Sequence, residues 1–172
     1  MHSPFRQHTI IIKWSNPIRW DRVAKFDSDW NGGWYYITRN IYRNGQCYVT
    51  PIYIGKASGK ISKRILNHTY RDSEKPFLRE YGEFEIRFGR VVSPLNYRTS
   101  YHYNRLLLTV ESALITEIYP KCNCSQTQRY TPWYKLVIKN TGKHDRIPDT
   151  ITTESQAAHH LSLPSWWDGT IV

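Results

Sequence analysis

The chain has 172 residues, of which 40% are hydrophobic and 15% are aromatic, and it carries a formal net charge of +10. This length and apolar content support one folded domain with its own core and exclude a disordered chain. The basic excess is uneven, because residues 33–142 hold 17 Lys and Arg against 7 Asp and Glu. A basic segment interleaved with aromatic residues favours a polyanionic partner such as nucleic acid.

Cysteine usage and hydropathy indicate the compartment. The three cysteines make an odd count without a disulfide framework, which favours a reducing environment. The first 14 residues lack the long apolar run of a signal peptide. No apolar run approaches the roughly 20 residues that cross a bilayer. We therefore expect a cytoplasmic protein that does not contact a membrane.

The first third of the chain predicts strands joined by a hairpin. The expected strands lie at residues 8–14, 34–38 and 46–54, and residues 20–26 form a short helix or an irregular arm. Asn44-Gly45 predicts a type I′ turn, since both central residues of that turn have positive φ. Pro51 fits the returning strand at a bulge, where no ladder hydrogen bond is lost. We expect Gly55 to end that strand.

The rest of the chain predicts helices alternating with strands. A helix follows Gly59, and alternating apolar and polar residues at 83–92 indicate a half-buried strand. An apolar stripe indicates a long helix over residues 106–119, which Pro120 ends. The other expected elements are a short helix at residues 77–81, a strand at residues 133–139 and an irregular tail from Asp145 onwards.

This order predicts an α+β domain with a small antiparallel sheet of three central strands flanked by helices. Within a single domain we distinguish three segments. Residues 1–32 form an N-terminal arm, residues 33–125 the core, and residues 126–172 a C-terminal extension packed on the core.

Two tyrosines next to glycines on paired strands are the first chemical candidates. The phenol of a free tyrosine has a pKa near 10, and a neighbouring cation lowers that pKa by favouring phenolate. Lys56 follows Tyr53 by three residues and is the expected cation. Tyr35 and Tyr53 therefore become candidates for activating or holding a water molecule, and the sequence leaves open which of them is the base.

Cations and one acid complete the candidate site. The guanidinium of Arg64 can clamp a phosphate with two hydrogen bonds, and His68, one helical turn later, can donate to a phosphate oxygen or transfer a proton. Glu111 lies beside the apolar stripe of the long helix, where a carboxylate is costly unless it is paired or bound to metal. We expect Glu111 to hold one Mg²⁺ or Mn²⁺, because Mg²⁺ commonly takes one or two carboxylates with water and phosphate oxygens.

The ordered motifs resemble the GIY-YIG nucleases. The residues that carry the resemblance are Gly33-Trp34-Tyr35, Tyr53-Ile54-Gly55-Lys56, Arg64, His68, Glu111 and Asn123. Together they cover about half the chain, and Trp34 replaces the usual aliphatic residue. The resemblance implies a three-stranded antiparallel sheet, Tyr35 as general base or water-positioner with Tyr53 in support, and Asn123 orienting the site by hydrogen bonds.

The spacing between the two tyrosines is longer than is usual in that family. The hairpin from Arg39 to Thr50 is therefore extended, and an extended hairpin can enter a DNA groove. This resembles stand-alone type II restriction endonucleases, which implies double-stranded DNA as substrate, a homodimer on DNA, and a prokaryotic or phage origin. The expected DNA-contacting residues are Arg39, Arg43, Lys60, Lys63, Lys139, Lys143 and Arg146.

Two alternatives remain open. One is a structure-specific or phage-type nuclease without a strict recognition sequence. The other is a nucleic-acid-binding module that keeps the fold without the chemistry.

Overall fold

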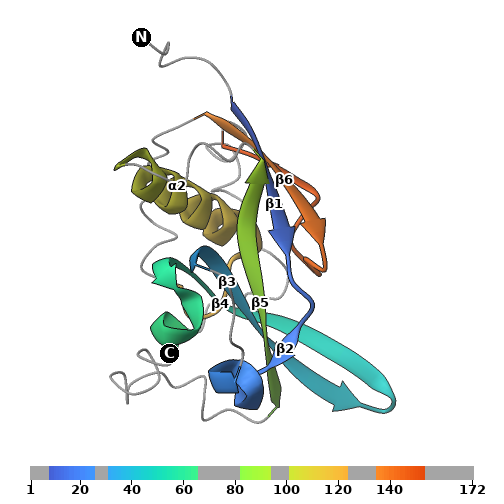
Figure 1. The fold of residues 1–172 in the computed structure, drawn as a ribbon. Coiled ribbons are helices and arrows are strands. Elements are labelled where there is room, and N and C mark those ends of the chain that lie inside the picture. The colour runs from blue at the N-terminus through green and yellow to red at the C-terminus, as the bar shows by residue number, and fades with distance from the viewer. Residues whose placement is uncertain (1–7, 26–30, 66–81, 94–100, 124–134, 154–172) are drawn as a thin grey trace.

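The computed structural model describes residues 8–25, 31–65, 82–93, 101–123 and 135–153, and these contain a curled seven-stranded sheet (Figure 1). The strands are β1 (His8–Trp14), β2 (Ile18–Arg19), β3 (Asn31–Arg43), β4 (Gln46–Lys60), β5 (Glu83–Ser93), β6 (Leu136–Gly142) and β7 (Thr150–Thr152). The helices are the 3-10 helix η1 (Trp20–Lys25), a helical turn at residues 61–65, and α2 (Tyr101–Ile118).

The sheet mixes antiparallel and parallel neighbours. Its strand order is β4-β3-β5-β1-β6-β7. The short β2 lies outside this order and also pairs with β5. All neighbouring strands run antiparallel except β1 and β6, which run parallel with His8 opposite Leu136 and Trp14 opposite Gly142. Strands from both ends of the described chain therefore meet in the middle of one sheet.

The predicted fold, a small sheet of three central strands flanked by helices, is wrong. α2 has 18 residues, which corresponds to a length of about 27 Å. Three strands spaced about 4.8 Å apart would span only about 10 Å, too little to cover its apolar stripe. β1, β6 and β7 supply the missing width, and α2 contacts the sheet from β4 to β7.

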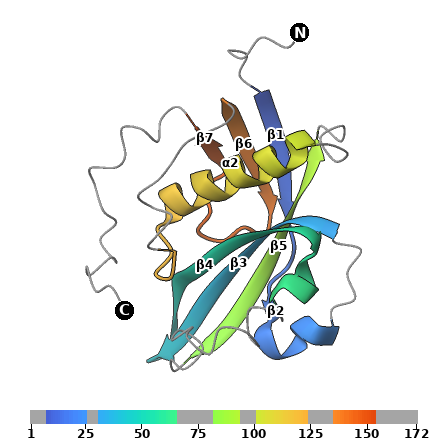
Figure 2. The ribbon, with the colours of Figure 1, turned by 90° about the vertical axis from the view of Figure 1, so that its left-hand side faces the viewer.

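Each face of the sheet carries its own apolar core. One face packs on α2 and includes Ile10, Ile12 and Trp14 of β1; we call it the α2 face (Figure 2). The opposite face includes Tyr35 of β3 and Phe88 of β5, and it packs on η1 and the helical turn at residues 61–65. We call it the tyrosine face. Both faces of central β5 are covered, so residues 86–89 are all buried, although a half-buried strand was predicted.

The hairpin prediction is confirmed in its turn and its bulge. Asn44 and Gly45 have φ values of 51° and 76°, and the pairing shifts between Ile37 and Thr38, where Pro51 lies opposite Thr38. The prediction that Gly55 ends the strand is wrong, because β4 continues to Lys60 through a Gly55 that pairs with β3.

Other boundaries also differ from those predicted. α2 begins five residues earlier than expected, β6 is shifted to Leu136–Gly142, and β7 forms where an irregular tail was expected. The apolar side chains of Ile147 and Ile151 account for the last difference, because both are buried in the core of the α2 face. The predicted helix at residues 77–81 lies outside the described residues.

Candidate active site

The two motif tyrosines lie face to face on neighbouring strands. Tyr35 on β3 and Tyr53 on β4 stack with ring centroids 5.9 Å apart and an interplanar angle of 26°. Their hydroxyl groups also form a hydrogen bond. Tyr35 is only 2% exposed, and its strand neighbours are Gly55 and Phe88. The paired strands therefore hold two phenol oxygens together at the edge of the tyrosine-face core.

The motif glycines allow this close arrangement. A Cβ added to Gly55 would lie 2.3 Å from the hydroxyl oxygen of Tyr35, so the phenol occupies the space that any other residue would fill. Gly33 has a φ of 138°, and its added Cβ would lie 2.2 Å from the carbonyl oxygen of Gly89. Only glycine permits that approach of β3 to β5.

Glu111 joins the tyrosines from α2. Its carboxylate accepts a hydrogen bond from the backbone N–H of Lys56 and interacts electrostatically with Tyr35. Burial raises the pKa of Glu111 to about 7, and the nearby Lys56 and Arg64 oppose that rise. The side chain is 6% exposed on an otherwise apolar stretch of helix, so this carboxyl group is held at a cost in stability.

The expected cation was Lys56, but the cation that acts on the pKa of Tyr35 is Arg64, and its effect is outweighed. Burial raises the pKa of the Tyr35 phenol well above the ordinary range, and Tyr53 and Glu111 raise it further. Arg64 lowers that pKa but does not overcome the burial. Tyr35 is therefore a neutral hydroxyl at physiological pH, suited to holding a water molecule and not to acting as a phenolate base.

Arg64 comes from the helical turn at residues 61–65. Ile61 and Ile65 fix that turn, because both are buried in the tyrosine-face core. Arg64 itself is exposed, yet it interacts electrostatically with both Tyr35 and Glu111. The exposed guanidinium can therefore contact a ligand beside Tyr35 and Glu111.

Asn123 supports the strand that carries Tyr53. The side chain of Asn123 accepts a hydrogen bond from the N–H of Ile54 at 2.8 Å and donates one to its carbonyl oxygen at 2.9 Å. Asn123 thereby continues the edge of β4 between Tyr53 and Gly55 and positions them. The predicted site residue His68 lies outside the described residues.

The metal prediction rests on Glu111 alone. Among the described residues, no three His, Cys, Asp or Glu side chains gather where they could hold a metal ion. One buried carboxyl group still fits Mg²⁺ or Mn²⁺, provided that water and a substrate phosphate complete the coordination shell.

The predicted DNA-contacting residues lie on two parts of the surface. Arg39 and Arg43 alternate along β3 with Tyr35 and so point to the tyrosine face. The others are exposed on the β4 end and following turn or around β6: Lys60, Lys63, Lys139, Lys143 and Arg146.

Sequence reasoning missed Lys13 on β1 and Arg90 on β5. Lys13 alternates with the buried Ile12 and Trp14, and Arg90 lies two residues after Phe88. The polar Lys13 between the apolar Ile12 and Trp14 of a predicted strand is the signal that would have placed Lys13 on the opposite face from them.

No family model, curated protein or solved structure matches this chain. Within the described residues, no helix is both long enough and apolar enough to cross a membrane.

Proposed function

We propose that this chain is a metal-dependent DNA endonuclease with GIY-YIG-type chemistry. The observation that supports the proposal is the convergence of Tyr35, Tyr53, Arg64 and Glu111, which come from two strands, a helical turn and a distant helix. A buried acid of raised pKa beside hydroxyl groups and a free guanidinium is typical of catalytic sites.

Each residue has a distinct part in phosphodiester hydrolysis. Arg64 binds the non-bridging oxygens of the scissile phosphate and offsets the charge that develops in the transition state. The hydroxyls of Tyr35 and Tyr53 hold the attacking water in line by hydrogen bonds. Glu111 would hold the Mg²⁺ or Mn²⁺, which supplies positive charge to the leaving 3′ oxygen.

The β3–β4 hairpin extends the proposed DNA-binding surface. β3 pairs with β5 only as far as Asn40, so the hairpin continues beyond it as a two-stranded ribbon (Figure 1). Arg43 and Tyr48 lie near its tip, and Tyr48 is 52% exposed. A two-stranded ribbon fits the major groove of B-DNA.

We further propose sequence-specific cleavage of both strands, as in a type II restriction enzyme of prokaryotic or phage origin acting in the cytoplasm. One cluster cuts one strand, so double-strand cleavage calls for a homodimer on DNA.

The deciding experiment is incubation with long unmethylated DNA and Mg²⁺, followed by sequencing of the ends. Discrete fragments support a restriction enzyme, and a smear supports a nuclease without a strict site. Failure to cut in either Mg²⁺ or Mn²⁺, with binding unaffected by EDTA, would overturn the proposal in favour of a binding module.

A further inference from the structure

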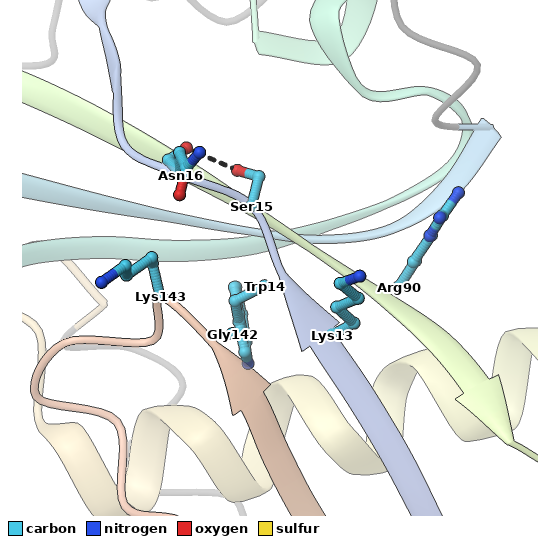
Figure 3. A pocket seen from close by; sticks show the side chains of 7 residues that line it. All are labelled: Lys13, Trp14, Ser15, Asn16, Arg90, Gly142 and Lys143. Carbon is cyan, nitrogen blue, oxygen red and sulfur yellow. Dashed lines mark hydrogen bonds between the residues drawn. The ribbon is translucent and has the colours of Figure 1, made fainter.

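An open pocket of about 500 Å³ lies where β1 and β6 end beside β5 (Figure 3). Its lining residues are Lys13, Trp14, Ser15, Asn16, Arg90, Gly142 and Lys143. Three of them are cations and none is acidic. Figure 3 shows Lys13 and Arg90 on one side of β1 and Lys143 on the other, with Trp14 and Gly142 between them.

The three cations come from neighbouring parts of the sheet. Lys13 and Arg90 are directly opposite each other on neighbouring antiparallel strands. No acidic residue of the described part of the chain forms an ion pair with Lys13 or Lys143. A bound anion would offset the charge of these two lysines.

The backbone around the pocket is fixed by packing and hydrogen bonds. Gly142 has a φ of 82°, and a Cβ added there would lie 2.3 Å from the carbonyl oxygen of Trp14. The indole N–H of Trp14 donates to the side-chain oxygen of Asn140 at 2.9 Å. The hydroxyl of Ser15 accepts from the N–H of Phe88 at 3.0 Å and donates to the carbonyl oxygen of Asn16 at 2.8 Å. The pocket is thus built into the sheet.

The two lining residues Lys13 and Arg90 share the tyrosine face with the candidate active site. Tyr35 pairs with Phe88, and Arg90 follows Phe88 by two residues on the same side of β5. Lys13 lies on the next strand, two strands from Tyr35, which is on the order of 10 Å across the sheet. Lys139 of β6, which lies opposite Ile11 of β1, extends the positive charge to the next strand.

We propose that this pocket binds a backbone phosphate of the DNA substrate, at a position other than the phosphate that is cleaved. The inference rests on the proposed nuclease function and adds Lys13 and Arg90 to its DNA-binding surface. Lysine and arginine contacts to phosphates position a duplex without reading its sequence. The pocket therefore fixes the register of the duplex relative to Tyr35 and Arg64.

The test is the salt dependence of DNA binding by a Lys13→Gln, Lys143→Gln double variant. Affinity for a short fluorescein-labelled duplex of mixed sequence is measured in EDTA between about 50 and 200 mM salt. We expect affinity to fall about tenfold and the slope of log affinity against log salt to become shallower by about one, since the one lost phosphate contact contributes about 0.9. Thermal unfolding verifies that the variant is folded.

The matched control is Asn104→Glu, Leu108→Glu on the exposed side of α2, which changes net charge by the same amount. It should leave the slope and the cleavage unchanged. A wild-type slope in the lysine variant, or an equal loss of affinity in the control, would overturn the proposed phosphate site. The nuclease proposal would still stand in that case if the wild-type chain cleaves DNA. A wild-type chain that neither binds nor cuts DNA would overturn both.

Discussion

Glu111 ties stability to function at the scale of one residue. Its folded pKa of about 7 lies above the ordinary value of 4.5, so its contribution to stability is fully present below pH 4.5 and is lost as pH rises through 7. Between those values the metal-free protein should lose about 3 kcal/mol of unfolding free energy. The Glu111→Gln variant should not show this loss of stability. Urea unfolding in EDTA at about pH 5 and pH 8 measures the difference in unfolding free energy.

The same Glu111→Gln variant should bind DNA normally but should not cleave it. A variant that cuts at the wild-type rate would rule out the metal assignment.

Tyr35 and Tyr36 offer a matched pair, because they are adjacent and point to opposite faces of β3. Tyr35→Phe should slow single-turnover cleavage about a hundredfold or more, because it removes a hydroxyl that orients water. Tyr36→Phe removes a buried hydroxyl without a hydrogen-bond partner, so it should leave cleavage unchanged and stability unchanged or higher. Equal loss of activity in both variants would contradict the role of Tyr35.

The sequence predicted which residues gather at this site better than it predicted their protonation. The order of motifs led to Tyr35, Tyr53, Arg64 and Glu111, which lie together in the structure. The raised pKa of Tyr35 was not predictable, because it depends on burial by strands that are distant in the sequence. Asn123 was expected to orient the site, but its pairing with the backbone of Ile54 required the fold.

At the scale of one strand, β4 carries two glycines with opposite surroundings. A Cβ at Gly55 would collide with the ring and hydroxyl of Tyr35, whereas a Cβ at Gly59 would meet nothing within 4 Å. Gly55→Ala should therefore displace Tyr35, reduce kcat more than DNA affinity, and lower stability by about 1–3 kcal/mol. Gly59→Ala is the control and should keep full activity. Normal cleavage by Gly55→Ala would show that the position of Tyr35 is unimportant.

Elements with local signals were predicted well, and those defined by distant partners were not. Asn44-Gly45 and Pro51 specify the hairpin and its bulge within a few residues. The three residues of β7 form a strand because β6 lies beside them and because Ile151 is buried under α2. Nothing in their local sequence indicates this pairing.

At the scale of the whole molecule, β1 is an integral strand and not a detachable arm. Ile10, Ile12 and Trp14 lie in the same core as α2. A chain that begins at residue 33 should therefore lose cooperative unfolding, as followed by far-UV circular dichroism on heating, because a large part of that core is removed. If the truncated chain melts cooperatively and cuts DNA, the smaller predicted core would be sufficient after all.

The width of the sheet could not be read from the sequence. Every strand except β2 and β7 was predicted close to its place, but the parallel pairing of β1 with β6 joins residues about 130 positions apart. No turn or short-range pattern specifies such a partner, and the resemblance to a smaller family fold favoured three strands.

The place of β1 between β5 and β6 has a consequence for biogenesis. β1 acquires its second neighbour only after Leu136–Gly142 has been synthesised. Until then one edge of β1 is unpaired and its apolar side chains are not covered. Closing the long loop between β1 and β6 is slow. A nascent chain of this protein should thus complete its sheet only after β6 has left the ribosome.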